Sequence, residues 1–222
     1  MTSPASEIEQ EVRVAARVAE MALLFVVAPV LLALGPRWMV SIGILGSGIL
    51  CLVLLLLDPT FARRQLAGLA EARRGLGPVL LRTSVIWALL LGVTLVFTPK
   101  TLFLFPRTRP HVWVAVMFLY PIFAYAQEIV CRTFFFHRYG MLFARRWTRI
   151  VVSGLVFGWA HVAVNNFVAV GLAAVAGVLF ASTYERSRST LLVSLEHALY
   201  GDFVFTVGLG SLFYSTARWV AH

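Results

Sequence analysis

The sequence is organised as long apolar runs separated by short polar and basic segments. About 20 apolar residues cross the hydrocarbon core of a bilayer as a helix. Seven runs approach that length, and they lie at about 21–35, 38–57, 79–97, 111–136, 150–164, 167–184 and 191–213. We therefore predict about seven membrane-spanning helices, because a membrane β-barrel would instead show segments of about ten residues that alternate in polarity.

The composition supports the same fold class. Apolar residues make up 60% of the 222 residues and charged residues only 13%, whereas a soluble domain is closer to half apolar and a quarter charged. An ordinary soluble domain, a disordered chain and a disulfide scaffold are thereby excluded. The prediction is an all-α, polytopic transmembrane helical bundle that forms one domain over 1–222 and begins with an amphipathic segment at 1–20.

Two runs predict how helices pack. The run 167–184 is rich in Gly and Ala, which allows close contact between helix backbones. The phenylalanine run 134–136 is expected to face lipid or the membrane interface.

Positive charge gathers in the connections between apolar runs. The formal net charge is +9, and Lys100 is the only lysine. Arginines are concentrated in the segments 58–78, 137–149 and 185–190, which the positive-inside rule places in the cytoplasm together with the N-terminus. The charge therefore reports topology. We expect the lipid bilayer as the partner and no nucleic acid, in an integral multi-pass protein of a prokaryotic plasma membrane.

A few ionisable residues interrupt the apolar runs. Because such residues are energetically costly in a bilayer, they are candidates for a functional site. Glu128, Glu196 and Asp202 are acidic, and His161 and His197 lie in late runs. At about 1.5 Å of rise per residue, Glu128, His161 and His197 reach roughly 13, 16 and 9 Å into the membrane from the same side. This common depth predicts a water-accessible cavity that opens to the cytoplasm.

The residue types leave several chemistries open for these groups. Glu128 and Arg132 are four residues apart, so they share a helix face and can pair. A carboxylate beside neutral imidazoles is suited to activating water, while a structural ion pair with two hydrogen-bonded histidines is the simpler alternative. Zinc held by His161, His197 and one carboxylate is a further alternative. Because every zinc ligand would come from a different helix and no H-E-x-x-H motif is present, we expect no cofactor.

Three short motifs give these residues a family resemblance. Residues 127–132 (QEIVCR) resemble the E-E-x-x-x-R motif of the CAAX protease and bacteriocin-processing (CPBP, or Abi) family of intramembrane proteases. Residues 157–161 (FGWAH) are similar to its F-x-x-x-H motif, and residues 196–202 (EHALYGD) resemble its third motif, a histidine followed by Asn or Asp. The resemblance covers about residues 110–215.

The resemblance implies a helical bundle around a cavity open to the cytoplasm, and peptide hydrolysis without a covalent intermediate. By position, Glu128 and Arg132 match the second Glu and the Arg of the first motif, and His161 and His197 match the other two histidines. A glutamate and a histidine would activate water, while His197 and Asp202 would stabilise the oxyanion. The substrate would be a protein or peptide cleaved close to the membrane, such as one with a C-terminal sorting signal or a bacteriocin-type leader.

The sequence departs from the family pattern at two positions. Gln127 stands where the family has its first glutamate, and an amide can orient water but cannot accept its proton at neutral pH. Glu128 would then be the base, or the chain is catalytically impaired, or Gln127 replaces an original glutamate. Gly201 stands where the third motif ends, so a helix break there would be needed to turn Asp202 inward. Asn165 is an alternative amide donor.

Three functions remain in competition. The leading hypothesis is an intramembrane endopeptidase that uses water activated by Glu and His. The second is an impaired family member that binds peptides in an immunity or chaperone role. The third is a proton-coupled transporter, against which the sequence shows no internal repeat of the transporter kind.

Overall fold

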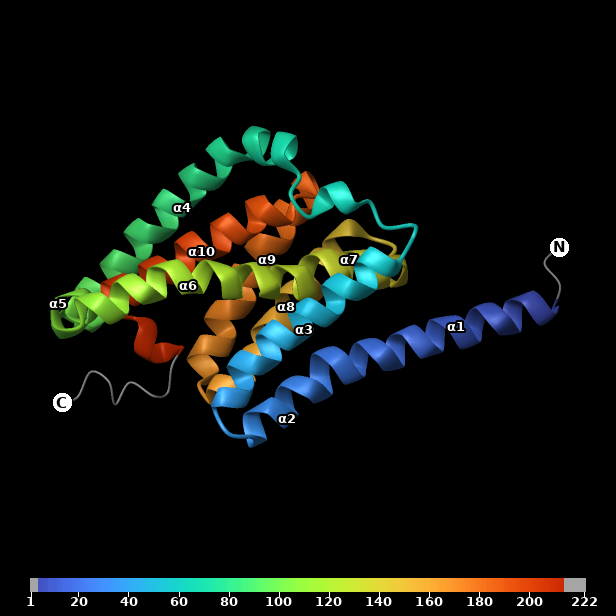
Figure 1. Cartoon of the computed structure of the whole chain (residues 1–222), viewed down its shortest axis with the longest axis horizontal. Helices are drawn as coiled ribbons and strands as arrows, with labels where there is room; N and C mark the ends of the chain where they lie inside the picture. The colour runs from blue at the N-terminus through green and yellow to red at the C-terminus, as the bar shows by residue number, and fades with distance from the viewer. Residues whose placement is uncertain (1–3, 214–222) are drawn as a thin grey trace.

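All regular structure in the described residues, 4–213 of the computed structural model, is helical, which confirms the all-α prediction. The bundle is elongated, and its N-terminal helix projects beyond the rest (Figure 1). The long helices are α1 (Pro4–Ala22), α3 (Trp38–Leu57), α4 (Leu69–Phe97), α6 (Pro110–Glu128), α8 (Arg146–Ala160), α9 (Phe167–Ser187) and α10 (Thr190–Val207). Shorter α-helices are α2 (Ala28–Leu34), α5 (Leu104–Thr108) and α7 (Phe135–Tyr139), and two π-helical turns are η1 (Leu23–Val27) and η4 (Ile129–Phe134).

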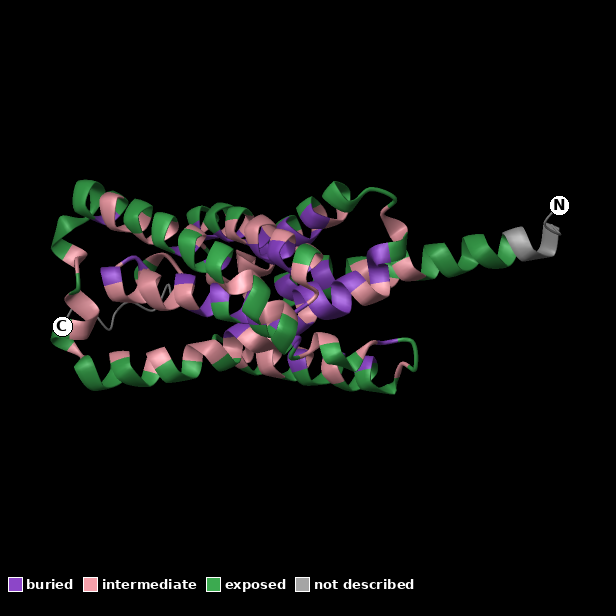
Figure 2. Cartoon of the chain, turned by 90° about the horizontal axis from the view of Figure 1, so that it is seen from above, coloured by how far each residue is buried: buried purple, intermediate pink, exposed green. Residues whose placement is uncertain are grey.

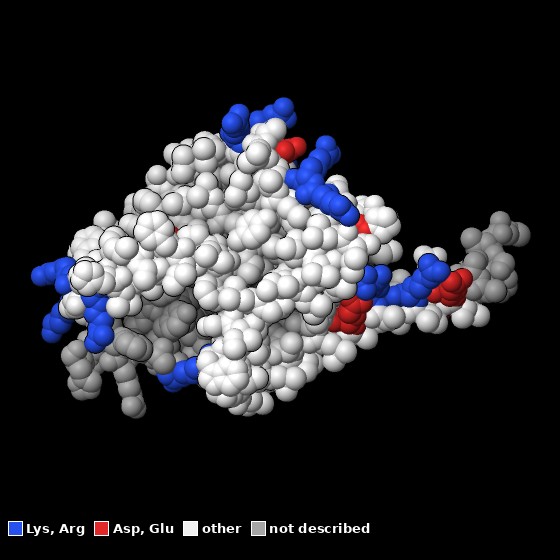
Figure 3. All heavy atoms as spheres, viewed as in Figure 1, with Lys and Arg blue, Asp and Glu red and all other residues white. Residues whose placement is uncertain are grey.

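Six helical segments within 4–213 are long and apolar enough to cross a membrane. They are Ile8–Leu34, Trp38–Leu57, Arg63–Phe97, Pro110–Leu142, Arg146–Val164 and Phe167–Ser187. On the face shown in Figure 3, charged side chains gather at the top of the view, at its left and lower edges and along α1, and most of the surface between them is uncharged. The chain is therefore an integral, multi-pass membrane protein.

Three expectations about individual segments differ from the structure. The seventh expected span forms α10, which is not among the six because its polar residues lower its hydropathy. α4 begins at Leu69 rather than near residue 79, so Pro78 lies inside a helix, as is tolerated in membrane helices. The phenylalanines at 134–136 do not face lipid; they are at most 5% exposed and belong to the core.

The α8–α9 contact follows from small residues, as the Gly- and Ala-rich run predicted. A Cβ atom at Gly154 would lie 2.7 Å from the backbone nitrogen of Val178, and one at Gly177 would lie 2.8 Å from the carbonyl oxygen of Gly154. The two backbones therefore touch, which larger side chains would prevent. Figure 2 shows that buried residues concentrate in the middle of the bundle, whereas residues 8–16 of α1 are exposed.

Hydrogen bonds from the segment after η4 attach α1 and the end of α3 to the bundle. Glu20 of α1 accepts two hydrogen bonds from Arg138, both of 3.0 Å, and one of 2.9 Å from the hydroxyl of Tyr139. Next to this contact, the His137 ring lies 2.9 Å from the Asp58 carboxylate. Hydrogen bonds from Thr60 and His137 hold the pKa of Asp58 well below its usual range.

Candidate active site

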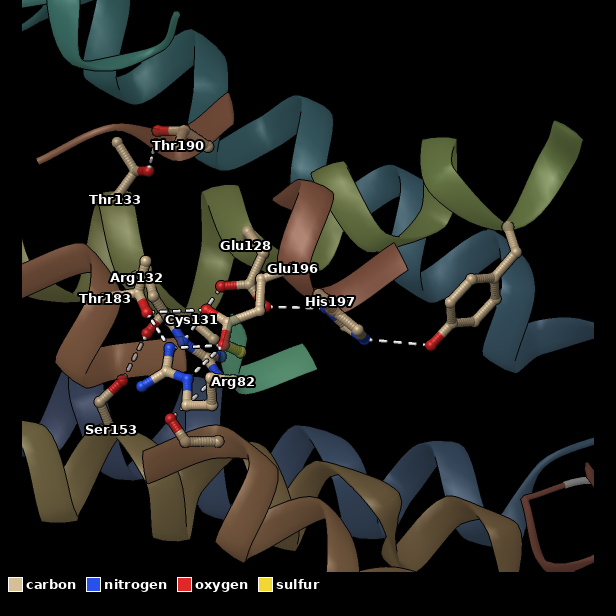
Figure 4. A network of polar contacts seen from close by, with 12 residues as sticks. Arg82, Glu128, Cys131, Arg132, Thr133, Ser153, Thr183, Thr190, Glu196 and His197 are labelled. Atoms are coloured by element: carbon tan, nitrogen blue, oxygen red, sulfur yellow. Dashed lines mark hydrogen bonds and ion pairs between the residues drawn. The ribbon is translucent and has the colours of Figure 1, made fainter. Parts of the chain in front are cut away.

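The candidate site is centred where α6 ends at Glu128 and continues into the π-helical turn η4. A π-helical turn widens the backbone and is often found at functional sites. The carbonyl of Cys131 in this turn accepts a 2.8 Å hydrogen bond from the hydroxyl of Ser153 on α8. Both Glu128 and Arg132 then point into the bundle, where neither has exposed surface (Figure 4).

Glu128 and Arg132 form the ion pair that their spacing predicted. The Nε atom of Arg132 lies 3.1 Å from Oε2 of Glu128. Arg132 also donates a 3.2 Å hydrogen bond to the carbonyl of Gly177, and its guanidinium lies 4.4 Å from the centre of the Phe157 ring. The arginine thus has an ionic, a polar and a cation–π partner, which together offset part of the cost of burying its charge.

His197 of α10 completes a buried carboxylate–imidazole pair. Its Nδ1 atom lies 2.8 Å from Oε1 of Glu128. Its Nε2 atom lies 3.1 Å from the hydroxyl of Tyr120. The ring stacks on Phe180, with centroids 4.8 Å apart, and meets the Phe157 ring edge-on at 5.2 Å. Both ring nitrogens therefore have polar partners, and the plane of the ring is held by aromatic contacts.

His161 lies next to this cluster, and its ring and that of His197 both contact the ring of Phe157. Phe157 contacts the ring of His161 at 4.8 Å and that of His197 at 5.2 Å. The Nδ1 atom of His161 lies 2.8 Å from the Phe157 carbonyl oxygen. Because a carbonyl can only accept a hydrogen bond, Nδ1 carries the proton, and the neutral ring offers Nε2 as an acceptor. His161 is thus set up to accept a proton, although within residues 4–213 its hydrogen bond is to Phe157 and not to Glu128.

The other predicted site residues lie outside the Glu128–His197 pair. Gln127 is half-buried, and its side chain makes no hydrogen bond within residues 4–213. The expected break at Gly201 is wrong: α10 is continuous from Thr190 to Val207. Asp202 therefore lies roughly 140° around α10 from His197, and its Oδ1 atom is buried without a hydrogen-bond partner in the described structure. Asn165 is exposed and ends a helical turn with a φ of 56°.

A second buried carboxylate, Glu196, belongs to a different network from its neighbour His197. Arg82 of α4 donates from Nε to Oε1 of Glu196 at 2.8 Å, and its Nη2 atom donates to both Glu196 and Thr183. The hydroxyls of Thr183 and Tyr200 donate to Glu196 at 2.7 and 3.1 Å. This network joins α4, α9 and α10 beside the site (Figure 4).

The packing around the pair is closed. Glu128 and Arg132 are fully buried and His197 is 4% exposed, because aromatic rings cover the imidazole. The expected water-accessible cavity is therefore not open at Glu128 in this conformation. No group of three or more His, Cys, Asp and Glu side chains within residues 4–213 could hold a metal ion, and the absence of a cofactor stays a prediction.

Sequence reasoning missed two residues of the cluster. Tyr120 lies outside all three motifs, and tyrosine is a common residue near a membrane interface, so its presence there did not indicate a site. Arg82 lies in an early run, and no pattern in the sequence indicated that it would reach Glu196. A polar residue at a helical spacing from Glu128 on the same helix was the available signal for Tyr120.

The comparisons with known proteins agree with the motif resemblance. Residues 108–201 match the family model described as type II CAAX prenyl endopeptidase Rce1-like. This segment contains Tyr120, Glu128, Arg132, His161 and His197. No curated protein and no solved structure matches the chain significantly.

Proposed function

We propose that this chain, a member of the CPBP family through its Rce1-like residues 108–201, cleaves a peptide bond in a protein or peptide substrate close to the membrane. The family is one of intramembrane endopeptidases. The observation that carries the proposal for this chain is the buried Glu128–His197 contact of 2.8 Å, with Arg132 beside it. Burying these ionisable side chains inside a membrane protein costs free energy, which favours a functional role over simple packing.

In the proposed mechanism, water attacks the substrate carbonyl carbon and Glu128 takes its proton. Oε1 of Glu128 is engaged by His197, so Oε2 is the oxygen that remains for water. Oε2 lies 3.1 Å from Arg132 Nε but without the geometry of a hydrogen bond. His161, through its acceptor Nε2, accepts a hydrogen bond from the same water and orients it, while Glu128 holds the transferred proton. The C–N bond then breaks, and the proton passes to the leaving amine.

Oxyanion stabilisation is the second part of the proposal. Donors must point to where negative charge develops on the substrate carbonyl oxygen. The half-buried Gln127 amide adjoins Glu128 in the chain and has its N–H groups uncommitted within residues 4–213, so it is the donor we favour. Asp202 would need to approach from another face of α10. Because Glu128 is fully buried, substrate binding must open the aromatic packing before water reaches it.

The proposal is tested by comparing protein termini in host-cell membranes that contain the wild type or His161→Ala. We expect a new terminus with the wild type that is absent with His161→Ala. His111→Ala is the matched control, since His111 is exposed at the start of α6, and it should retain the terminus. Identical termini in all three samples would contradict the proposal.

Gln127 favours a second candidate, an impaired family member that binds peptides without cutting them. An amide in place of a carboxylate removes one base from the site. Gln127→Glu separates the candidates. Cleavage by the Glu variant alone would identify the wild type as the impaired binder, whereas cleavage by the wild type itself would exclude that role.

A further inference from the structure

Tyr120 lies on the opposite side of the His197 ring from Glu128, and none of the three motifs contains it. Its hydroxyl is 3.1 Å from Nε2 of His197, while Nδ1 of the same ring is 2.8 Å from Oε1 of Glu128. Tyr120 and Glu128 both belong to α6, roughly two helical turns apart. One imidazole from α10 therefore bridges two polar side chains of a single neighbouring helix.

The glycine at position 201 makes room for this arrangement. A Cβ atom at Gly201 would lie 2.0 Å from Cε1 and 2.3 Å from the hydroxyl oxygen of Tyr120. Any other residue at 201 would thus collide with the tyrosine ring. Phe205 packs against the same ring in a T-shaped contact, with centroids 5.5 Å apart. The space that a side chain would fill in α10 is occupied by the tyrosine that reaches His197.

The chemistry of the three groups fixes where the protons lie. An ionised carboxylate only accepts hydrogen bonds, so Nδ1 of His197 carries the proton that it donates to Glu128. A neutral imidazole has one N–H, which leaves a lone pair at Nε2. The phenol of Tyr120 then donates to Nε2. The single N–H of His197 is already used by Glu128, so His197 does not donate to a substrate oxyanion in this state.

We propose that Tyr120 is a positioning residue for the site. By donating to Nε2 it holds the imidazole in its Nδ1–H form and orientation, and the imidazole in turn holds Oε1 of Glu128 so that Oε2 faces water. The catalytic consequence rests on the proposed function, but the proton arrangement does not. Gly201 takes part by admitting the tyrosine ring.

The proton arrangement is tested by nitrogen NMR of the full chain labelled with 15N-histidine in detergent micelles, with His197→Ala to assign the signal. We expect Nδ1 of His197 to be protonated and Nε2 to have the shift of a hydrogen-bonded acceptor. Tyr120→Phe should move Nε2 to the shift of an unbonded acceptor, and Gly201→Ala should do the same with the tyrosine still present. Tyr125→Phe is the matched control, because Tyr125 of α6 donates to Leu66 and not to a histidine.

Activity tests the positioning role separately. Loss of one hydrogen bond of this kind lowers kcat by about 3- to 10-fold in Tyr120→Phe, with KM unchanged, while Tyr125→Phe keeps the wild-type kcat. An Nε2 signal that is protonated, or that does not respond to Tyr120→Phe, would overturn the proton arrangement. A responsive signal with unchanged kcat would overturn the positioning role. Absence of cleavage by every form, with the expected NMR signals, would refute the proposed function and leave the proton arrangement established.

Discussion

Oε1 of Glu128 lies 2.8 Å from Nδ1 of His197, although 69 residues of sequence separate them. The contact joins the end of α6 to the middle of α10 inside the bundle. Two features of the packing surround this contact. The turn η4 directs Arg132 toward Gly177. The helices α8 and α9 supply the Phe157 and Phe180 rings that pack around the imidazole.

Removal of Arg132 should destabilise the fold. Arg132→Leu leaves the Glu128 carboxylate buried without its counter-ion, which costs about 3–5 kcal/mol. Chemical unfolding in detergent measures this loss. Glu128→Gln/Arg132→Leu, which removes both charges, should recover part of the stability, and a double variant no more stable than Arg132→Leu would contradict the ion-pair account.

The Arg82–Glu196 network should behave as a structural contact. Arg82→Ala removes the counter-ion of the buried Glu196 carboxylate, so we expect a loss of about 3 kcal/mol in the free energy of unfolding. Arg186→Ala, at an exposed arginine of α9, is the control and should change stability by no more than about 0.5 kcal/mol. Equal stability of the two variants would show that Arg82 does not stabilise the buried carboxylate.

The α8–α9 contact predicts opposite effects for two glycines of α9. Gly177→Ala places a Cβ atom 2.8 Å from the Gly154 carbonyl and should cost about 1–3 kcal/mol by overpacking. Gly171→Ala meets nothing within 4 Å and should be neutral or stabilising by up to about 1 kcal/mol. Thermal unfolding of both variants checks the prediction, which fails if Gly177→Ala is as stable as Gly171→Ala.

The Asp58 contacts predict a pH dependence of stability. Hydrogen bonds from Thr60 and His137 lower the pKa of Asp58 in the folded state, so its stabilising effect is present above the usual aspartate pKa of about 4. That effect is lost as the pH falls through the lowered pKa. The difference in Tm between wild type and Asp58→Asn should therefore be constant above about pH 5 and shrink as the pH falls from there to about pH 3. A difference that is constant with pH would contradict the account.

The local periodicity of the sequence predicted the helices and the Glu128–Arg132 pair, because both depend on residues close in the chain. It did not predict that α10 passes through Gly201 without a break. A glycine in a helical pattern often marks a turn or lowers helix stability. Here Gly201 leaves room for the ring of Tyr120, a residue far away in the sequence. For the same reason the Phe134–Phe136 run looked lipid-facing, since burial depends on which helices surround η4.

The motifs predicted that Glu128, Arg132 and His197 share one site, and in the structure these residues form one cluster. The sequence placed His161 at the same depth, and the structure adds that His161 and His197 both contact the ring of Phe157. Sequence alone could not show this shared contact, since it depends on how α8 packs against α10. The catalytic roles of these residues stay predictions.

The most direct test of the central claim is a cleavage assay with purified protein in lipid vesicles, using the substrate identified from the new terminus. Glu128→Gln is isosteric and cannot accept a proton, so the rate should fall by about 10²-fold or more. Glu71→Gln, at a half-buried glutamate in the first turn of α4, should cut at the wild-type rate. Full cleavage by Glu128→Gln would show that this chain does not hydrolyse peptides at the Glu128–His197 site.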